Sequence, residues 1–141
     1  MESKRLNTPN RPMPPLACDC HMHVFEPRFG MGAGAPAPMA SAAMYRQMQA
    51  RLGLQRVVVV QANRYGSDNR GMLDAMAEFG DGARGVAVVE PDTSEAELQR
   101  LTALGVRGVR FHMLPGGHLQ WTQLDAVAAR VRPFGWHLQL Q

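Results

Sequence analysis

The sequence predicts an α/β protein built on a parallel sheet, with about five strands and four helices. Short apolar runs of strand length alternate along the chain with longer segments whose apolar residues recur at intervals of three and four. The last four predicted strands begin at residues 55, 84, 106 and 136, so neighbouring strands are separated by the length of one βα unit. With 141 residues, 45% of them hydrophobic, the chain can bury a core but holds at most one domain.

Five segments have the composition of strands. The clearest contains Val57–Val60, a continuous β-branched run typical of a parallel strand that is buried on both faces. Residues 1–15 are polar and proline-rich, and we expect them to form a disordered lead-in to a folded part over residues 16–141. The predicted strands are Leu16–His23, Gln55–Gln61, Arg84–Val89, Val106–Phe111 and Trp136–Leu140.

Four segments between the strands have helical periodicity, namely 44–52, 72–79, 94–104 and 120–132. In the first, Met44, Met48 and Leu52 are predicted to form the apolar stripe that faces the core. The third is marked most clearly, because Ser94 followed three residues later by Glu97 fits a capping box. Each of these segments is followed by a glycine, the residue that most often ends a helix.

Charge and targeting features exclude several classes of function. The net charge is +3, the basic residues are scattered and only 6% of residues are aromatic, so we expect no nucleic-acid groove. There is neither a signal peptide nor an apolar run long enough to cross a membrane. Cys18 and Cys20 are too widely spaced on one strand face to form a disulfide, and we expect a cytoplasmic protein.

The sharpest chemical signal lies at the end of the first predicted strand. Alternate residues of a strand share a face, so Asp19, His21 and His23 are predicted to project together. Two adjacent imidazoles either bind one divalent metal ion or polarise one carbonyl group. The alternative is that they are two half-exposed histidines without a joint role.

The second strand is followed by two amide residues. The alternation that places Val57 and Val59 on one face also places Gln61 and Asn63 there. A face that changes from aliphatic to amide residues at the carboxyl end of a strand is typical of a barrel interior that opens into a polar site. For Asn63, capping of the next helix is the competing interpretation.

Later polar residues extend this pattern. Arg110, near the end of the fourth strand, offers a planar fork for a carboxylate. On the last strand His137, Gln139 and Gln141 form a polar row, with His137 at the wrong end to bind a metal. His118 lies in a glycine-rich loop, where we expect it to be exposed to solvent.

Four segments together carry a family resemblance: Asp19-x-His21-x-His23, VVVVQANRYGSDNRGMLDAM, GVRGVRFHML and FGWHLQLQ. From Leu16 to its last residue the chain resembles the amidohydrolase superfamily, in the lactonase-like branch of its TIM-barrel hydrolases. The resemblance implies a (β/α)₈ barrel in which His21 and His23 bind one divalent ion such as Zn²⁺, or polarise the scissile carbonyl without metal. It also implies that Arg110 binds a substrate carboxylate, while Gln61 and Asn63 orient the substrate.

The resemblance covers only part of such a barrel. A complete one has eight strands in about 250 residues, so the chain is expected to be the N-terminal portion, a partial TIM barrel. In the lactonase-like members the water-activating aspartate lies on the last strand, and we therefore expect little or no turnover from this chain alone. The first and fifth strands would be free edges, which another copy of the chain would cover in a homo-oligomer.

The function that follows from the resemblance is hydrolysis of a lactone or a related carboxylated ring-cleavage intermediate. Two alternatives stay open. One is a non-catalytic half-barrel remnant that works by pairing with itself. The other is a metal-dependent decarboxylase of the same superfamily.

Overall fold

The computed structural model describes residues 9–30 and 39–141 and confirms the predicted α/β fold. Nine main elements alternate along it, separated by short 3₁₀ helices. They are β1 (Cys18–Met22), α1 (Ala42–Leu52), β2 (Arg56–Val60), α2 (Arg70–Phe79), β3 (Ala83–Ala87), α3 (Glu95–Ala103), β4 (Val106–Phe111), α4 (Leu124–Val131) and β5 (His137–Leu140). Residues 1–8 of the predicted lead-in lie outside the described residues, and residues 9–15 form turns and irregular backbone.

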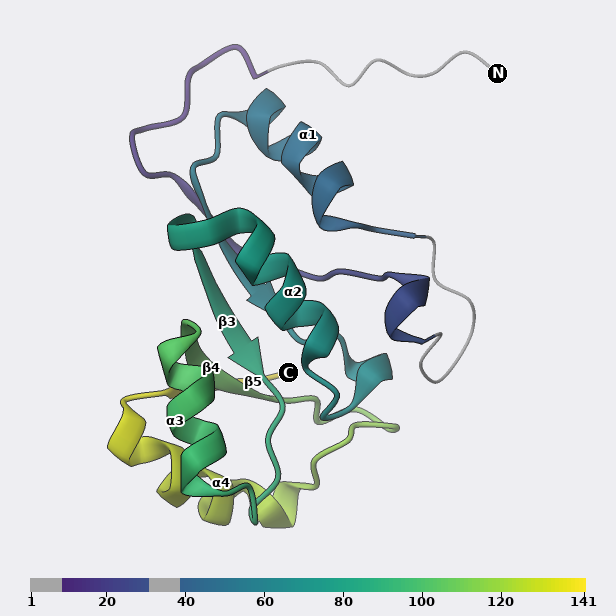
Figure 1. Cartoon of the computed structure of the whole chain (residues 1–141), viewed down its shortest axis with the longest axis vertical. Helices are drawn as coiled ribbons and strands as arrows, with labels where there is room; N and C mark the ends of the chain where they lie inside the picture. The colour runs from purple at the N-terminus through teal and green to yellow at the C-terminus, as the bar shows by residue number, and fades with distance from the viewer. Residues whose placement is uncertain (1–8, 31–38) are drawn as a thin grey trace.

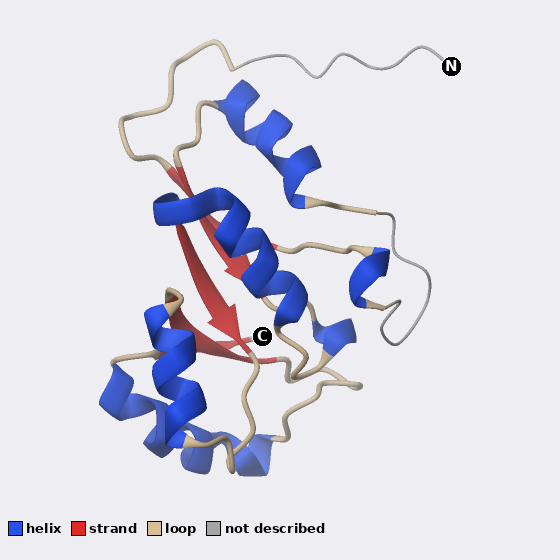
Figure 2. Cartoon of the chain, in the orientation of Figure 1, coloured by secondary structure: helices blue, strands red, loops and turns tan. Residues whose placement is uncertain are grey.

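The five strands form one parallel sheet in the order β1-β2-β3-β4-β5. The sheet is curled, and the helices lie along its outer, convex face (Figures 1 and 2). This is the arrangement of the first five strands of a (β/α)₈ barrel, so the predicted partial TIM barrel is confirmed. Because the strands are parallel, all their carboxyl ends lie at the same edge of the sheet, and that edge carries the candidate site.

The core lies between the sheet and the helices. Val57 and Val59 belong to it, together with Met72 and Met76 of α2. The register pairs Val59 with Gly85 on β3, and a Cβ atom at Gly85 would lie 2.5 Å from the Met76 sulfur. Helix α2 therefore packs directly on the backbone of β3, and a larger residue at this position would push the helix away from the sheet.

The helix starts follow the predicted capping chemistry in part. The Ser94 hydroxyl accepts a hydrogen bond from the Glu97 backbone N–H at 3.2 Å, which is the first half of the predicted capping box. The Glu97 carboxylate does not close the box, because it forms a bidentate ion pair with Arg100 one turn later. The predicted helix over 120–132 begins in a 3₁₀ turn, and Trp121 in that turn is 58% exposed.

The apolar stripe predicted for α1 was wrong. Ala42 and Tyr45 are the buried residues of this helix, whereas Met44 and Met48 are about half exposed. The reason is the position of β1 at the edge of the sheet, since among the described residues no further strand pairs with β1 beside α1. Pairing of the two free sheet edges with another copy of the chain stays a prediction. Within the described ranges, no helix is long and apolar enough to cross a lipid bilayer.

Candidate functional site

Side chains from the carboxyl ends of β1, β2, β4 and β5 line a cavity of about 510 Å³ at this edge of the sheet. Four of the five predicted site residues, His21, His23, Asn63 and Arg110, meet in it, and Gln61 does not. Within the described residues, the lining has no Asp or Glu side chain: it consists of His21, His23, Phe25, Ala62, Asn63, Arg64, Arg110, His112, Gln139, Leu140 and Gln141.

The two histidines of β1 point at one another. Their Nε2 atoms are 3.2 Å apart, and the rings meet edge to face. His23 Nδ1 lies 2.8 Å from the Val60 carbonyl oxygen, which only accepts hydrogen bonds, so Nδ1 carries a proton. In neutral His23 the Nε2 atom is therefore an acceptor, and His21 Nε2 donates to it. The Nε2–H group of His21 and the Nε2 lone pair of His23 thus face one another at the floor of the cavity.

Desolvation and the Arg110 cation favour the neutral form of both imidazoles. Loss of contact with water lowers the pKa of His21 and of His23 below the usual value of 6.5, and the nearby Arg110 cation lowers both further. For His23, the hydrogen bond to the Val60 carbonyl acts in the opposite direction but does not outweigh burial. A neutral imidazole N–H is the form that donates a hydrogen bond to a polarised carbonyl oxygen without adding a charge.

Asp19 lies outside the cavity that holds Arg110, but it lines a second cavity of about 370 Å³ together with both histidines. The register between β1 and β2 shifts by one residue between Asp19 and Met22, as in a β-bulge. The Asp19 carboxylate accepts hydrogen bonds from the hydroxyl of Tyr45 on α1, at 2.8 Å, and from the backbone N–H of His21, at 3.0 Å. Asp19 thus holds the bulged backbone against α1, while His21 and His23 turn inward.

Arg110 is the one buried cation in the described part of the chain, with 6% of its surface exposed. Its NH1 group lies 3.5 Å from His21 Nε2, which places a guanidinium directly beside the imidazole pair. NH1 also donates to the side-chain oxygen of Gln139 at 2.7 Å, and NH2 donates to that of Gln141. The Nε–H group is buried without a partner.

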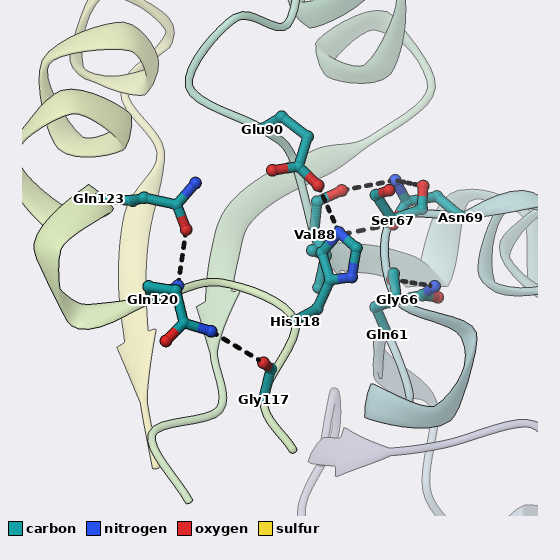
Figure 3. A network of polar contacts seen from close by, with 10 residues as sticks. All are labelled: Gln61, Gly66, Ser67, Asn69, Val88, Glu90, Gly117, His118, Gln120 and Gln123. Atoms are coloured by element: carbon teal, nitrogen blue, oxygen red, sulfur yellow. Dashed lines mark hydrogen bonds and ion pairs between the residues drawn. The ribbon is translucent and has the colours of Figure 1, made fainter. Parts of the chain in front are cut away.

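Gln61 is absent from the lining of this cavity, but with Asn63, Arg110 and His112 it lines a narrow hollow next to it. Val57 and Val59 belong to the core between the sheet and the helices, and the buried Gln61 follows them at the end of β2. The Gln61 amide group donates to the carbonyl oxygens of Gly66 and Asp68 at 2.9 and 2.8 Å. Gln61 therefore fixes the β2–α2 loop, as Figure 3 shows for Gly66.

The loops around the cavity are held by a network of polar contacts (Figure 3). Asn69 binds both backbone groups of Val88, joining the β2–α2 loop to the end of β3. Asn63 donates to the Gly116 carbonyl oxygen at 3.0 Å, which joins the same loop to the segment after β4. His118 is exposed to solvent, as expected, and it also pairs with Glu90. These contacts give the mouth of the cavity a fixed outline.

Comparison with known proteins agrees with this geometry. The sequence profile of the amidohydrolase family matches residues 18–141. The chain belongs to the amidohydrolase family. It is 39% identical over 140 residues to the 2-pyrone-4,6-dicarboxylate hydrolase of Comamonas testosteroni, and 34% identical over 137 residues to the D-galactarolactone isomerase of Agrobacterium fabrum. The alignments cover 92% and 94% of this chain but only 46% and 47% of those enzymes, so the chain spans about half their length.

Solved amidohydrolase structures match the fold as well as the sequence. An apo crystal structure from Agrobacterium tumefaciens superposes with a TM-score of 0.86 at 34% identity, covering 94% of this chain and 50% of that one. A probable 2-pyrone-4,6-dicarboxylic acid hydrolase from Acinetobacter baumannii, solved with citric acid bound, superposes with a TM-score of 0.73 at 26% identity, over 89% and 49% of the two chains. The predicted family is confirmed.

The described residues of this amidohydrolase do not by themselves make the predicted zinc site. Two imidazoles that share a tetrahedral Zn²⁺ have nitrogens about 3.3 Å apart, and the 3.2 Å spacing of His21 and His23 fits that value. However, nowhere in residues 9–30 and 39–141 do three or more His, Cys, Asp or Glu side chains come together in a way that suits a metal ion. Arg110 would also bring a positive charge against the ion.

Three residues that contribute to the amidohydrolase cavity had no predicted role. They are His112, Gln139 and Gln141, which line it beside Arg110. The alternation of polar and apolar residues on the last strand identified the face of Gln139 and Gln141, and only the sheet register shows that Gln139 lies opposite Arg110. His137, on the same face, is at the far end of β5 and outside the cavity, as expected.

The lowered histidine pKa values predict that acid destabilises the fold. The unfolded chain takes up protons on these histidines near pH 6.5, whereas the folded chain resists protonation until lower pH. The stabilisation is therefore complete above pH 6.5 and is lost as the pH falls through the folded pKa values. We expect urea unfolding to show a lower free energy at about pH 5.5 than at about pH 7.5. The difference should be smaller in His23→Gln, and an equal difference in that variant would contradict the assignment.

Proposed function

We propose that the chain carries the carbonyl- and carboxylate-binding half of a lactone-hydrolysing site. The observation that carries the proposal is the placement of two neutral imidazoles and a buried guanidinium around one cavity whose described lining has no carboxylate. Such a cavity attracts an anionic substrate and presents hydrogen-bond donors to a carbonyl oxygen. The relatives named as a hydrolase of 2-pyrone-4,6-dicarboxylate and an isomerase of D-galactarolactone support a carboxylated lactone as the substrate class.

Each residue of the cavity has a distinct part in this proposal. Arg110 pairs with a substrate carboxylate, which places the lactone carbonyl near the imidazole pair. When water adds to that carbonyl, negative charge develops on its oxygen, and the Nε2–H group of His21 stabilises it by turning its hydrogen bond from His23 to that oxygen. Before the substrate binds, His23 Nε2 accepts the hydrogen bond from that N–H group, which fixes the tautomer of His21. Asn63 lines the cavity and ties its mouth to the loop after β4.

The described lining has no Asp or Glu side chain that could activate water. General-base catalysis of hydrolysis needs an acceptor within hydrogen-bond reach of the attacking water, and the family resemblance implies an aspartate on the last barrel strand for this role. We therefore expect the chain alone to bind the lactone but to hydrolyse it with little or no turnover.

Ligand binding and turnover test the proposal separately. We expect 2-pyrone-4,6-dicarboxylate to bind the 141-residue chain saturably by calorimetry, and His21→Ala to weaken binding about tenfold because it removes the donor beside Arg110. Absence of saturable binding would overturn the function. Hydrolysis that disappears in His21→Ala would confirm the function but contradict the expected lack of turnover.

Metal removal separates this function from the decarboxylase alternative. After dialysis against a chelator, we expect lactone binding to be unchanged, because the described residues supply only two metal ligands. Loss of binding on chelation, with recovery on addition of Zn²⁺, would support a metal-dependent enzyme instead.

A further inference from the structure

The environment of Arg110 differs from that of the other paired arginines. Arg28, Arg70 and Arg100 each form an ion pair with a carboxylate, and all three are more than half exposed. Arg110 is 6% exposed, and within residues 9–30 and 39–141 none of the ion pairs includes it. Its acceptors are the amide oxygens of Gln139 and Gln141. The most buried cation thus has neutral partners, while these three exposed arginines have charged partners.

Neutral partners change what the guanidinium is able to bind. An amide oxygen satisfies an N–H group and fixes its direction but leaves the positive charge uncompensated. A buried cation without a counter-ion is unfavourable, and the Arg110 Nε–H group, buried without any partner, adds to that cost. A glutamate at either glutamine position would remove most of this cost, so the arrangement is not the one that stability alone favours.

The sheet register explains how the two glutamines reach the guanidinium. Gln139 lies directly beside Arg110 on the neighbouring strand, and Gln141 follows two residues later on the same face. The Gln141 side-chain oxygen also lies 3.1 Å from His112 Nδ1, so it accepts a hydrogen bond from that ring and leaves His112 Nε2 as an acceptor. Gln141 therefore fixes two groups of the cavity at once.

We propose that Gln139 and Gln141 are positioning residues, which hold the Arg110 guanidinium through neutral oxygens so that its charge is kept for a carboxylate of the ligand. The inference rests on the proposed function of this cavity and adds two residues to its substrate recognition. A purely structural role for the glutamines makes a different prediction for ligand binding. A change to glutamate would then form a buried ion pair and raise stability, and ligand affinity would stay the same.

The test is Gln139→Glu, with citrate as the probe because citric acid is bound in the crystal structure of a relative. Gln47→Glu is the matched control, since it makes the same charge change on the exposed side of α1. By calorimetry on the full chain in metal-free buffer, we expect Gln139→Glu to weaken citrate binding at least about tenfold, the effect of losing one charge-assisted contact. The control should bind as the wild type does. The midpoint of thermal unfolding of Gln139→Glu should be equal to or higher than that of the wild type.

A second variant and a spectroscopic signal distinguish a loss of binding from a folding defect. Gln141→Glu should weaken citrate binding in the same way, and the Arg110 Nε–H resonance should shift on addition of citrate in the wild type and stay in place in both variants. Wild-type affinity in a folded glutamate variant would overturn the proposal, and so would a wild-type chain that does not bind citrate. Citrate binding by a chain that does not bind the lactone would instead refute the proposed function and leave the role of the glutamines intact.

Discussion

Arg110→Met is expected to weaken citrate binding about 100-fold without destabilising the fold, since a charge-assisted pair contributes about 3 kcal/mol to binding. The variant removes the one buried cation of the described cavity lining and puts an apolar side chain of similar length in its place. It also removes the buried Nε–H group that has no partner. Replacing a buried charge by an apolar group is often neutral or stabilising, so the free energy of unfolding should stay within about 1 kcal/mol of the wild type or rise.

The control for this variant is Arg51→Met on the exposed surface of α1, which lowers the net charge equally. It should leave citrate binding unchanged, because long-range attraction to a net charge of +3 is weak beside a direct contact. Citrate affinity and unfolding in urea are both measured on the two variants. A loss of more than about 2 kcal/mol of stability in Arg110→Met would identify Arg110 as a structural residue and contradict its role in binding.

Strand alternation places polar residues reliably only where the sequence of the strand distinguishes its two faces. The last strand alternates polar and apolar residues, so its inward row was predicted correctly. β2 is apolar at Val57, Val58, Val59 and Val60, because both of its faces are covered, and such a run does not show which face lies inside the barrel. Gln61 was assigned to the cavity on that ambiguous alternation; its amide group fixes the β2–α2 loop, and its side chain lines a narrow hollow next to the cavity together with Arg110.

Two other differences arise from tertiary structure. A bulge in β1 leaves Asp19 outside the cavity that holds Arg110, and strict alternation of residues does not predict a bulge. Exposure of Met44 and Met48 follows from the position of α1 at a sheet edge, which depends on strand order and not on the periodicity of the helix. In contrast, the structure brings the histidine pair and Arg110 together in one cavity, because they lie at the carboxyl ends of strands, where a parallel sheet brings side chains together.

Phe111→Ala is expected to reduce the free energy of unfolding by about 3–5 kcal/mol, the usual effect of deleting a buried aromatic ring. Phe111 follows Arg110 in β4 and points to the opposite face, where it is fully buried in the core with Val109 and Val127. Since a domain has a total stability of about 5–15 kcal/mol, this one change removes a large share of it.

The contrast between these neighbours tests the division of β4 into a core face and a cavity face. Phe111→Ala should lower the midpoint of urea unfolding while the slope stays the same, and below that midpoint it should bind citrate as the wild type does. Phe111→Leu, which keeps most of the apolar volume, should lose only about 1–2 kcal/mol. Because consecutive strand residues face opposite sides, stability and ligand binding should respond to different residues of the same strand. If Phe111→Ala weakened citrate binding as much as Arg110→Met does, the cavity would depend on core packing rather than on the guanidinium.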